Sequence, residues 1–358
     1  MSIKSFLTEL VPYCIIKKRC AVRYKKQTRI HLDKSLPPIA ETTSKFEFMV
    51  SVQGLGFSGS GAVVDLLREY PSCLVLGTID VDGSQTKGDR NKNGEVDILR
   101  HSGGLFEIEN YLLNNNPFHK DALMKRFIRL VDTTDIFKIP ELRMLANQFY
   151  NSLVEFEINT EGHFDYNAHL ANVMRPDSNI KVMKDLTVAE YQYICRNFLA
   201  SLTNFFYEDG KTHIVLDQSC QDGNYDTKRN LKYLPNLKTI VVYRDPRDVY
   251  FYAVTRGVTW IAHNNVDTFI SWFKNEVRLL ELNSEDYLVI RFEDLINNYP
   301  NQVEKIEDYL GLDSHSHNKF RNLNPDISRK NIGIWKSMPS LTSDYEVIKN
   351  TLPIYCYE

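Results

Sequence analysis

The stretch from Phe46 to Leu67, FEFMVSVQGLGFSGSGAVVDLL, predicts a buried strand, a glycine-rich turn and a helix. Its apolar residues first alternate with others and then run continuously, as in a strand that is buried in a sheet. Four glycines and two serines follow between Gly54 and Gly61, and the next residues place apolar side chains on one helical face. Because glycines allow sharp turns and a helix N-terminus carries free N–H groups, this arrangement predicts an anion-binding site.

Three kinds of nucleotide-binding loop match this turn to different degrees. The spacing Gly-x-Gly-x-x-Gly from residue 54 fits a dinucleotide fingerprint, with Asp80 at the right distance to hold a ribose. A Walker A loop needs a lysine and a hydroxyl residue where Ala62 and Val63 stand, so an ATPase or kinase of that type is not expected. The third kind of loop holds the 5′-phosphosulfate group of a sulfuryl donor. The turn alone leaves the choice open.

The composition is that of a globular protein. The 358 residues are 43% hydrophobic, 12% aromatic and 25% charged, and the net charge of −3 does not favour nucleic acid as a partner. Six cysteines without a CxxC pair predict reduced thiols and a cytoplasmic protein. No apolar run reaches the ~18 residues that a membrane span requires.

The charge is uneven along the chain. Residues 1–45 contain ten Lys and Arg against three Asp and Glu. Such a mixture of basic and apolar residues is typical of peripheral contact with an anionic membrane face, here through residues 1–35, and also of a solvated basic arm. The predicted organisation is therefore a basic arm over 1–45, one α/β domain over 46–340 and a C-terminal tail over 341–358.

Further apolar segments predict more strands, with helical periodicity between them. A long helix is predicted over Thr187–Tyr207, beginning with a capping box between Thr187 and Glu190. Strands alternating with helices indicate a P-loop-like, three-layer α/β sandwich, with a central, mostly parallel sheet of about five strands and helices on both faces. The predicted additional strands are Ser72–Thr78, His213–Asp217, Lys238–Tyr243 and Asp286–Phe292.

Two charged segments follow these strands. The strand that ends at Tyr243 continues into Arg-Asp-Pro-Arg-Asp, so Arg244 is predicted at the carboxyl end of a buried strand, where α/β sheets bind ligands. Its guanidinium could bind a phosphate through two hydrogen bonds, or the four charges could form ion pairs that only stabilise the turn. Near the C-terminus, Arg329 to Lys336 reads RKNIGIWK, which indicates either a basic loop that closes on a nucleotide or an exposed loop.

Taken together, four elements resemble the sulfotransferases that use 3′-phosphoadenosine 5′-phosphosulfate (PAPS). They are the glycine–serine turn, the Arg-Asp-Pro-Arg-Asp turn, the segment YLVIRFEDLINNYPNQVEKIEDYLGL (Tyr287–Leu312) and the late R-K-x-x-G-x-W-K. The resemblance is strongest to bacterial, carbohydrate-type members and to the Golgi carbohydrate and tyrosylprotein branches. It implies metal-independent, in-line transfer of a sulfuryl group from PAPS to an acceptor hydroxyl of a saccharide or lipid-linked glycan.

The resemblance also implies roles for individual residues. The 3′-phosphate is assigned to Arg244 and Tyr252, and the basic loop that closes on the donor to Arg329, Lys330 and Lys336. Phe57 stands where the family usually has a basic residue, so Arg100, Arg229 or Lys330 would have to replace that cation. The residues assigned to the 5′-phosphosulfate are Ser58, Gly59, Ser60, Gly61 and Ala62.

The general base is expected shortly after the second strand, as in many relatives. Glu95 is the first candidate, followed by His101, with Asp217 as a third. Two other functions stay open at this point. One is an oxidoreductase of the Rossmann type that binds NAD or FAD, and the other is a relative that binds the nucleotide without catalysis.

Overall fold

The computed structural model describes most of the chain and divides it into two compact units. Residues 77–103 are outside the described part, and with them the candidates Asp80, Glu95, Arg100 and His101, as are residues 1–34 of the basic arm. One unit comprises Met1–Glu41 and His101–Phe198, and the other comprises Thr42–Arg100 and Leu199–Glu358. The described residues are 35–76, 104–112, 117–159, 179–217, 227–259, 261–282, 287–314 and 320–358.

The second unit is built on a five-stranded sheet in the order β2-β5-β1-β6-β7. Every neighbouring pair is parallel, and β1 lies in the centre with all residues after Phe48 buried. Strands that are buried on both faces read as continuous apolar runs, which is why the sequence revealed them. The predicted α/β class with a parallel sheet is confirmed. The strands are β1 (Phe48–Gly54), β2 (Cys73–Leu76), β5 (His213–Asp217), β6 (Leu237–Tyr243) and β7 (Leu288–Arg291).

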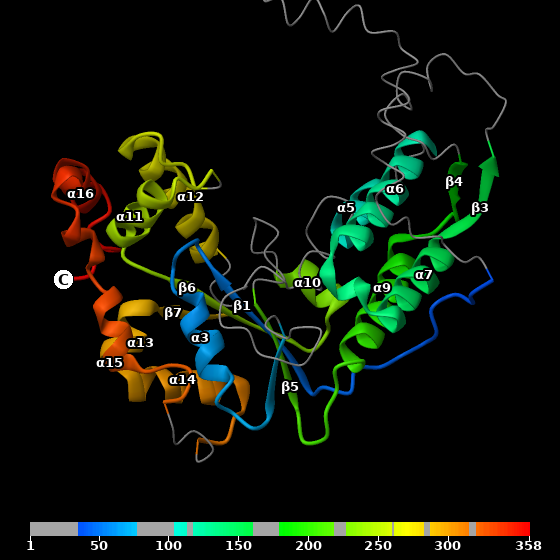
Figure 1. Cartoon of the computed structure of the whole chain (residues 1–358), viewed down its shortest axis with the longest axis horizontal. Helices are drawn as coiled ribbons and strands as arrows, with labels where there is room; N and C mark the ends of the chain where they lie inside the picture. The colour runs from blue at the N-terminus through cyan, green and yellow to red at the C-terminus, as the bar shows by residue number, and fades with distance from the viewer. Residues whose placement is uncertain are drawn as a thin grey trace, which may run out of the picture. The chain divides into compact units, whose positions relative to one another are not determined.

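Helices cover both faces of this sheet, as Figure 1 shows. Ile240 and Val242 of β6 belong to one hydrophobic core and Val241 to the other, because successive residues of a strand point to opposite faces. The helices over the first core are α3 (Ser60–Leu67), α13 (Phe292–Asn297) and α14 (Tyr299–Leu310). The helices over the second core are α11 (Pro246–Arg256), α12 (Val266–Leu282) and α16 (Thr342–Thr351).

The segment 341–358, which the sequence separates as a tail, contains α16. Tyr345 and Ile348 of this helix are buried in the second core, together with Leu352 and Cys356. The remaining short elements of this unit are α10 (Thr227–Tyr233), α15 (Pro325–Ser328), η4 (Arg329–Asn331), η5 (Ile334–Ser337) and η6 (Pro339–Leu341).

The strand order bears on the dinucleotide alternative. In Rossmann folds the strand that follows the glycine turn pairs directly with the first strand, which brings its terminal acidic residue to the ribose. Here β1 pairs with β5 and β6, and β5 separates it from β2. The topology therefore does not support a dinucleotide held between the glycine turn and the end of β2.

The first unit contains helices and a small antiparallel sheet. Its two strands, β3 and β4, pair with Glu157 opposite Lys181, and the sequence pattern did not predict them. β3 begins directly after α7 with no breaker residue between them, so no turn signal in the sequence marks where it starts. The elements are α5 (Leu105–Leu112), α6 (Pro117–Thr133), η1 (Asp135–Lys138), α7 (Pro140–Leu153), β3 (Val154–Asn159) and β4 (Asn179–Met183).

The predicted long helix is α9 (Val188–Asn204), and its capping box is confirmed. The Thr187 N–H donates to Glu190 Oε2 over 2.8 Å, and the Glu190 N–H donates to Thr187 Oγ1 over 3.2 Å. Throughout the described residues, we find no helix with the length and apolar character needed to cross a membrane.

Candidate active site

The loop 55–59 connects β1 to α3 and has an unusual backbone. Gly56, Phe57 and Gly59 adopt left-handed conformations, with φ of 79°, 46° and 87°. Gly59 precedes α3, and no side chain caps the helix. A helix N-terminus carries N–H groups without intrahelical acceptors and a partial positive charge. The uncapped first turn of α3 therefore lies at the carboxyl end of the central strand, where the sequence predicted an anion site.

The hydroxyl group of Ser58 lies inside this loop. Ser58 is only 1% exposed, and its Oγ has no hydrogen-bond partner among the described residues. A Cβ added to Gly54 would lie 2.3 Å from Ser58 Oγ and 3.1 Å from Ser60 Oγ, so both serine side chains are next to the same glycine. An unpaired buried hydroxyl costs about 1–3 kcal/mol, which an anion oxygen that accepted its hydrogen bond would offset. The glycine cradle, by which we mean loop 55–59 with Ser60 and the first turn of α3, thus offers the hydroxyl and N–H donors that an anion site needs.

The ring of Phe292 lies next to Gly59 of this loop. A Cβ on Gly59 would come within 2.3 Å of Phe292 Cδ2, so only glycine fits there. Phe292 begins α13, directly after β7, and its ring centroid lies 4.9 Å from the guanidinium carbon of Arg244. This phenylalanine is part of the R-F-E-D motif, but its role at the glycine turn was not predicted from the sequence.

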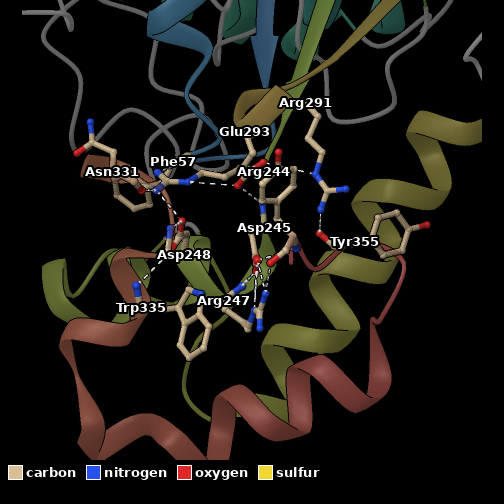
Figure 2. Close-up of polar contacts among 12 residues, drawn as sticks. Phe57, Arg244, Asp245, Arg247, Asp248, Arg291, Glu293, Asn331, Trp335 and Tyr355 are labelled. Atoms are coloured by element: carbon tan, nitrogen blue, oxygen red, sulfur yellow. Dashed lines mark hydrogen bonds and ion pairs between the residues drawn. The ribbon is translucent and has the colours of Figure 1, made fainter. Parts of the chain in front are cut away.

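Arg244 joins three segments that are distant in sequence, as Figure 2 shows. The residue is 4% exposed and follows the last residue of β6. Its Nη1 lies 3.5 Å from the carbonyl oxygen of Phe57, and its Nη2 donates to the carbonyl oxygen of Asn331. The glycine turn, the turn after β6 and the loop of residues 329–336, called the C-terminal loop below, therefore meet at the guanidinium of Arg244. Sequence analysis had singled out each of these segments separately.

The alternative interpretation of the charged turn, a set of ion pairs, is also present. Arg244 Nη2 lies 2.8 Å from Asp248 Oδ2, and Arg244 packs against the ring of Tyr252 as well. Asp248 accepts hydrogen bonds from the backbone N–H groups of Gly333, over 2.9 Å, and Trp335, over 3.0 Å. Burial raises the pKa of the Asp248 carboxyl, against the opposing effect of Arg244. This carboxylate thus fixes the C-terminal loop to α11.

The other two charges of the turn bind the C-terminal residues. Arg247 Nη2 lies 2.6 Å from Asp245 Oδ2 and donates to the carbonyl oxygen of Tyr357 over 2.8 Å. Burial lowers the pKa of Arg247, but the hydrogen bond and charge of Asp245 more than offset this, so the pKa is raised. The Asp245 N–H donates to Glu293 Oε1 over 2.9 Å, and burial raises the pKa of this glutamate. The R-F-E-D motif is therefore connected to the same network.

The remaining residues that the resemblance assigns to PAPS lie next to loop 55–59 or on the C-terminal loop. Ser60 and Gly61 begin α3, and the Ala62 N–H donates to the Gly59 carbonyl over 2.9 Å. Tyr252 is half-buried, with its ring centroid 5.4 Å from that of Phe57. On the C-terminal loop the basic side chains of Arg329, Lys330 and Lys336 are exposed.

Among the candidate bases and replacement cations, Asp217, Arg229 and Lys330 are in the described part. Asp217 ends β5 and pairs in register with Val52 of β1, so it lies at the same carboxyl edge of the sheet as the glycine turn. Arg229 lies in α10, which packs on β6. Glu95, Arg100 and His101 lie outside the described residues. In the described part, no cluster of three or more His, Cys, Asp or Glu side chains is arranged to hold a metal ion.

One further cation at the loop was not predicted. The Arg256 guanidinium carbon lies 5.4 Å from the ring centroid of Phe57 and 5.0 Å from that of Tyr252. Tyr252 and Arg256 are one helical turn apart in α11, which is the only signal that the sequence contains for this contact.

Comparisons with known proteins find distant structural similarity. No protein-family model matches the sequence, and a comparison with curated proteins finds no match. The sulfotransferase domain of the olefin synthase from Synechococcus PCC 7002 aligns with 90% of this chain and 99% of its own length, at 13% identity and a TM-score of 0.37. Sulfotransferase STF9 from Mycobacterium avium aligns with 91% of this chain and 78% of its own length, at 11% identity and a TM-score of 0.34.

A third solved structure, sulfotransferase STF1 from Mycobacterium tuberculosis H37Rv, aligns with 89% of this chain and 81% of its own length, at 12% identity and a TM-score of 0.33.

Proposed function

We propose that the protein transfers a sulfuryl group from PAPS to an acceptor hydroxyl. The observation that carries this proposal is the buried Ser58 hydroxyl, which has no partner among the described residues and lies in a glycine cradle at the N-terminus of α3. Such a cradle suits a tetrahedral anion with several oxygens. A nucleoside triphosphate is not favoured, because the loop has no Walker lysine.

The two anionic ends of the donor would bind on different sides of the loop. Ser58, Ser60 and the first turn of α3 would hold the 5′-phosphosulfate. The 3′-phosphate would lie beside Tyr252, on the side where Arg244 contacts the Phe57 carbonyl. Both ends would then be bound by residues at the carboxyl edge of the sheet, where α/β proteins bind their ligands.

In the proposed reaction the acceptor oxygen attacks sulfur in line with the leaving group. A new sulfur–oxygen bond to the acceptor forms as the bond between sulfur and the phosphate oxygen breaks, and the electron pair of that bond stays on the phosphate. The acceptor proton passes to a base, for which Asp217, Glu95 and His101 are the proposed candidates. Fixed hydroxyl and N–H donors around the phosphate stabilise the charge that develops there.

The proposed acceptor is a hydroxyl of a saccharide or lipid-linked glycan in the cytoplasm. The resemblance of the four motifs to carbohydrate-type sulfotransferases supports this class of acceptor. The ten basic residues of segment 1–45 support a contact with an anionic membrane surface, where a lipid-linked acceptor would be found.

Isothermal titration calorimetry tests the proposal with the reaction product, adenosine 3′,5′-bisphosphate. We expect the protein to bind the bisphosphate and not NAD, and Ser58→Ala to weaken the binding about tenfold or more, since it removes a hydrogen bond to a charged group. Ser271→Ala is the matched control, because Ser271 is exposed on α12 and donates to its own helix. Binding of NAD alone would overturn the proposal.

The second candidate function is nucleotide binding without transfer. Phe57, at a position where the resembling enzymes carry a cation, is the observation that favours it. Donor labelled with ³⁵S separates the two functions. Transfer of label to a glycan fraction supports the enzyme, whereas tight bisphosphate binding with no transfer to any glycan or to water supports the non-catalytic function.

A further inference from the structure

We propose that Arg256 recognises an anionic group, a carboxylate or a sulfate ester, on the saccharide acceptor. This inference rests on the proposed function and names the class of acceptor, an acidic saccharide, that the transferase would select. The proposed donor contacts involve the glycine cradle, Arg244 and Tyr252, and they leave Arg256 unassigned. Its guanidinium carbon nevertheless lies 5.4 Å from the ring centroid of Phe57, inside the cradle, and 5.0 Å from that of Tyr252.

The charge of Arg256 is exposed and has no carboxylate partner in the described part of the chain. Arg256 is the last residue of α11, and its side chain faces solvent. The buried Arg244 and Arg247, in contrast, each pair with an aspartate. A guanidinium without an ion-pair partner can bind an anion that arrives from solvent, and no existing ion pair has to break.

The two aromatic rings hold the Arg256 guanidinium in a form that suits an oxyanion. The rings of Phe57 and Tyr252 lie 5.4 Å apart at an interplanar angle of 32°, and the guanidinium packs on both. A guanidinium that packs on aromatic faces keeps its N–H edge available, and this edge matches two oxygens of a carboxylate or a sulfate. Its restricted rotation also reduces the entropy that is lost when a ligand binds.

The backbone of Phe57 is strained at the point where these contacts begin. Among the described residues other than glycine, Phe57 alone has a positive φ, of 46°. Residues in such conformations cluster at functional sites, where the surrounding contacts maintain them. The carbonyl oxygen of Phe57 lies 3.5 Å from Arg244 Nη1, whereas its ring contacts Tyr252 and Arg256. The main chain of Phe57 therefore meets the buried arginine and its side chain meets the exposed one.

The position of Arg256 suits the acceptor side of the proposed reaction. In-line transfer requires the acceptor oxygen to approach sulfur from the side opposite the phosphate, so the acceptor has to enter from solvent while the donor fills the cradle. Phe57 immediately precedes Ser58, to which the phosphosulfate is assigned. A saccharide that presents one hydroxyl to the sulfur can then place a neighbouring anionic group against Arg256.

The first test asks which glycans accept the label. Glycans extracted from the source organism are separated by anion exchange into a neutral and an acidic pool, and each is incubated with ³⁵S-labelled PAPS and the full chain. We expect the label in the acidic pool. Carboxyl reduction removes carboxylates and solvolytic desulfation removes sulfate esters, so the treatment that lowers transfer identifies the group that is recognised. Label confined to the neutral pool, or transfer that persists after both treatments together, would overturn the inference.

The second test changes the guanidinium. We expect Arg256→Gln to raise the apparent KM for the acidic pool about tenfold, because it removes hydrogen bonds to a charged group, and to leave the affinity for adenosine 3′,5′-bisphosphate unchanged. Arg256→Lys keeps the charge and should restore part of the loss. Salt screens exposed charges, so about 0.5 M sodium chloride should raise this KM more for the unmodified protein than for Arg256→Gln. Lys305→Gln, on the exposed surface of α14, is the matched control and should behave as the unmodified protein.

The outcomes separate this inference from the proposed function. If the unmodified protein transfers label and Arg256→Gln has the same KM for the acidic pool, Arg256 does not recognise the acceptor. An equal loss of bisphosphate affinity in Arg256→Gln would also overturn the assignment, since it would indicate a structural effect on the loop. If the unmodified protein binds the bisphosphate but labels neither pool, the proposed transfer fails and the inference falls with it.

Discussion

At the scale of single residues, Asp248 has the most consequential set of contacts. One carboxylate accepts from Arg244 Nη2 and from the N–H groups of Gly333 and Trp335, and the side chain is fully buried. A buried carboxylate is stable only when its charge is paired and its oxygens are hydrogen-bonded, and here both conditions are met. The contacts join α11 to the C-terminal loop, so the loop cannot move without exposing a buried charge.

Replacing Asp248 should therefore destabilise the protein strongly. We expect Asp248→Ala to lower the free energy of unfolding by about 3–5 kcal/mol, because it leaves Arg244 as a buried charge without its partner. Urea unfolding followed by circular dichroism measures the change. Asp326→Ala is the control, since Asp326 forms an exposed ion pair with Arg329 over 3.6 Å and such pairs contribute about 0–1 kcal/mol. Similar losses in the two variants would contradict the role given to Asp248.

At the scale of elements, the turn between β1 and α3 depends on Gly59 for two separate reasons. Its φ of 87° is unfavourable for any residue with a Cβ, and a Cβ there would collide with the ring of Phe292. Gly257, which ends α11, has a φ of 58° but nothing within 4 Å of an added Cβ. Comparing alanine variants of the two glycines therefore separates the cost of backbone strain from the cost of a steric clash.

We expect Gly257→Ala to cost about 1–2 kcal/mol, from the left-handed backbone alone. Gly59→Ala should cost about 1–3 kcal/mol more, because the methyl group also forces Phe292 to move. It should further abolish bisphosphate binding, whereas Gly257→Ala should retain it. Urea unfolding and calorimetry of both variants give the comparison, and equal destabilisation would show that the contact with Phe292 does not constrain the turn.

At the scale of the whole molecule, the parallel sheet collects the motifs at one edge. β1, β6 and β7 run in the same direction, so the residues that follow them meet at their carboxyl ends: the glycine turn, Arg244 and Phe292. The last residues of the chain close the network from outside, where Arg291 donates to the Tyr355 carbonyl over 2.6 Å and Arg247 donates to that of Tyr357. The site therefore depends on the packing of the C-terminal residues.

The reactivity of the Cys356 thiol measures how tightly the C-terminal residues pack. The thiol is buried, and burial, followed by the charge of Asp245, raises its pKa to about 11. A thiol with a raised pKa is mostly protonated at pH 8, and only the thiolate is the nucleophile. We expect iodoacetamide to label Cys356 very slowly at pH 8, with a rate that increases as the pH approaches 11.

Arg291→Lys should accelerate the labelling at pH 8, because it removes the guanidinium that holds Tyr355 next to the cysteine and keeps the positive charge that lowers the pKa of Cys356. Peptide-level mass spectrometry measures the rate at this position apart from the other cysteines. Cys195, which is buried in α9, serves as the internal control and should not change. Rapid labelling of Cys356 in the unmodified protein would contradict the packing of the C-terminal residues described here.

Much of the sheet unit could be predicted from the sequence because its signals are local. The five strands are short apolar runs, and the glycines at 54, 56 and 59 mark a turn that few residues other than glycine can form. The capping box at Thr187 is likewise a pattern within a few residues. β3 was missed because its alternation of apolar residues with Glu155 and Glu157 continues directly from a helix.

Sequence by itself determined which segments carry the chemistry: a glycine–serine turn after one buried strand and a charged turn after another. Tertiary structure alone decided how the charges are shared among them. Arg244 and Asn331, or Asp248 and Gly333, are more than eighty positions apart, and a hydrogen bond between them follows from strand order and helix packing. The physical reason is that the fold, and not the residue type, determines whether a guanidinium is buried against carboxylates, as Arg244 is, or exposed on aromatic rings, as Arg256 is.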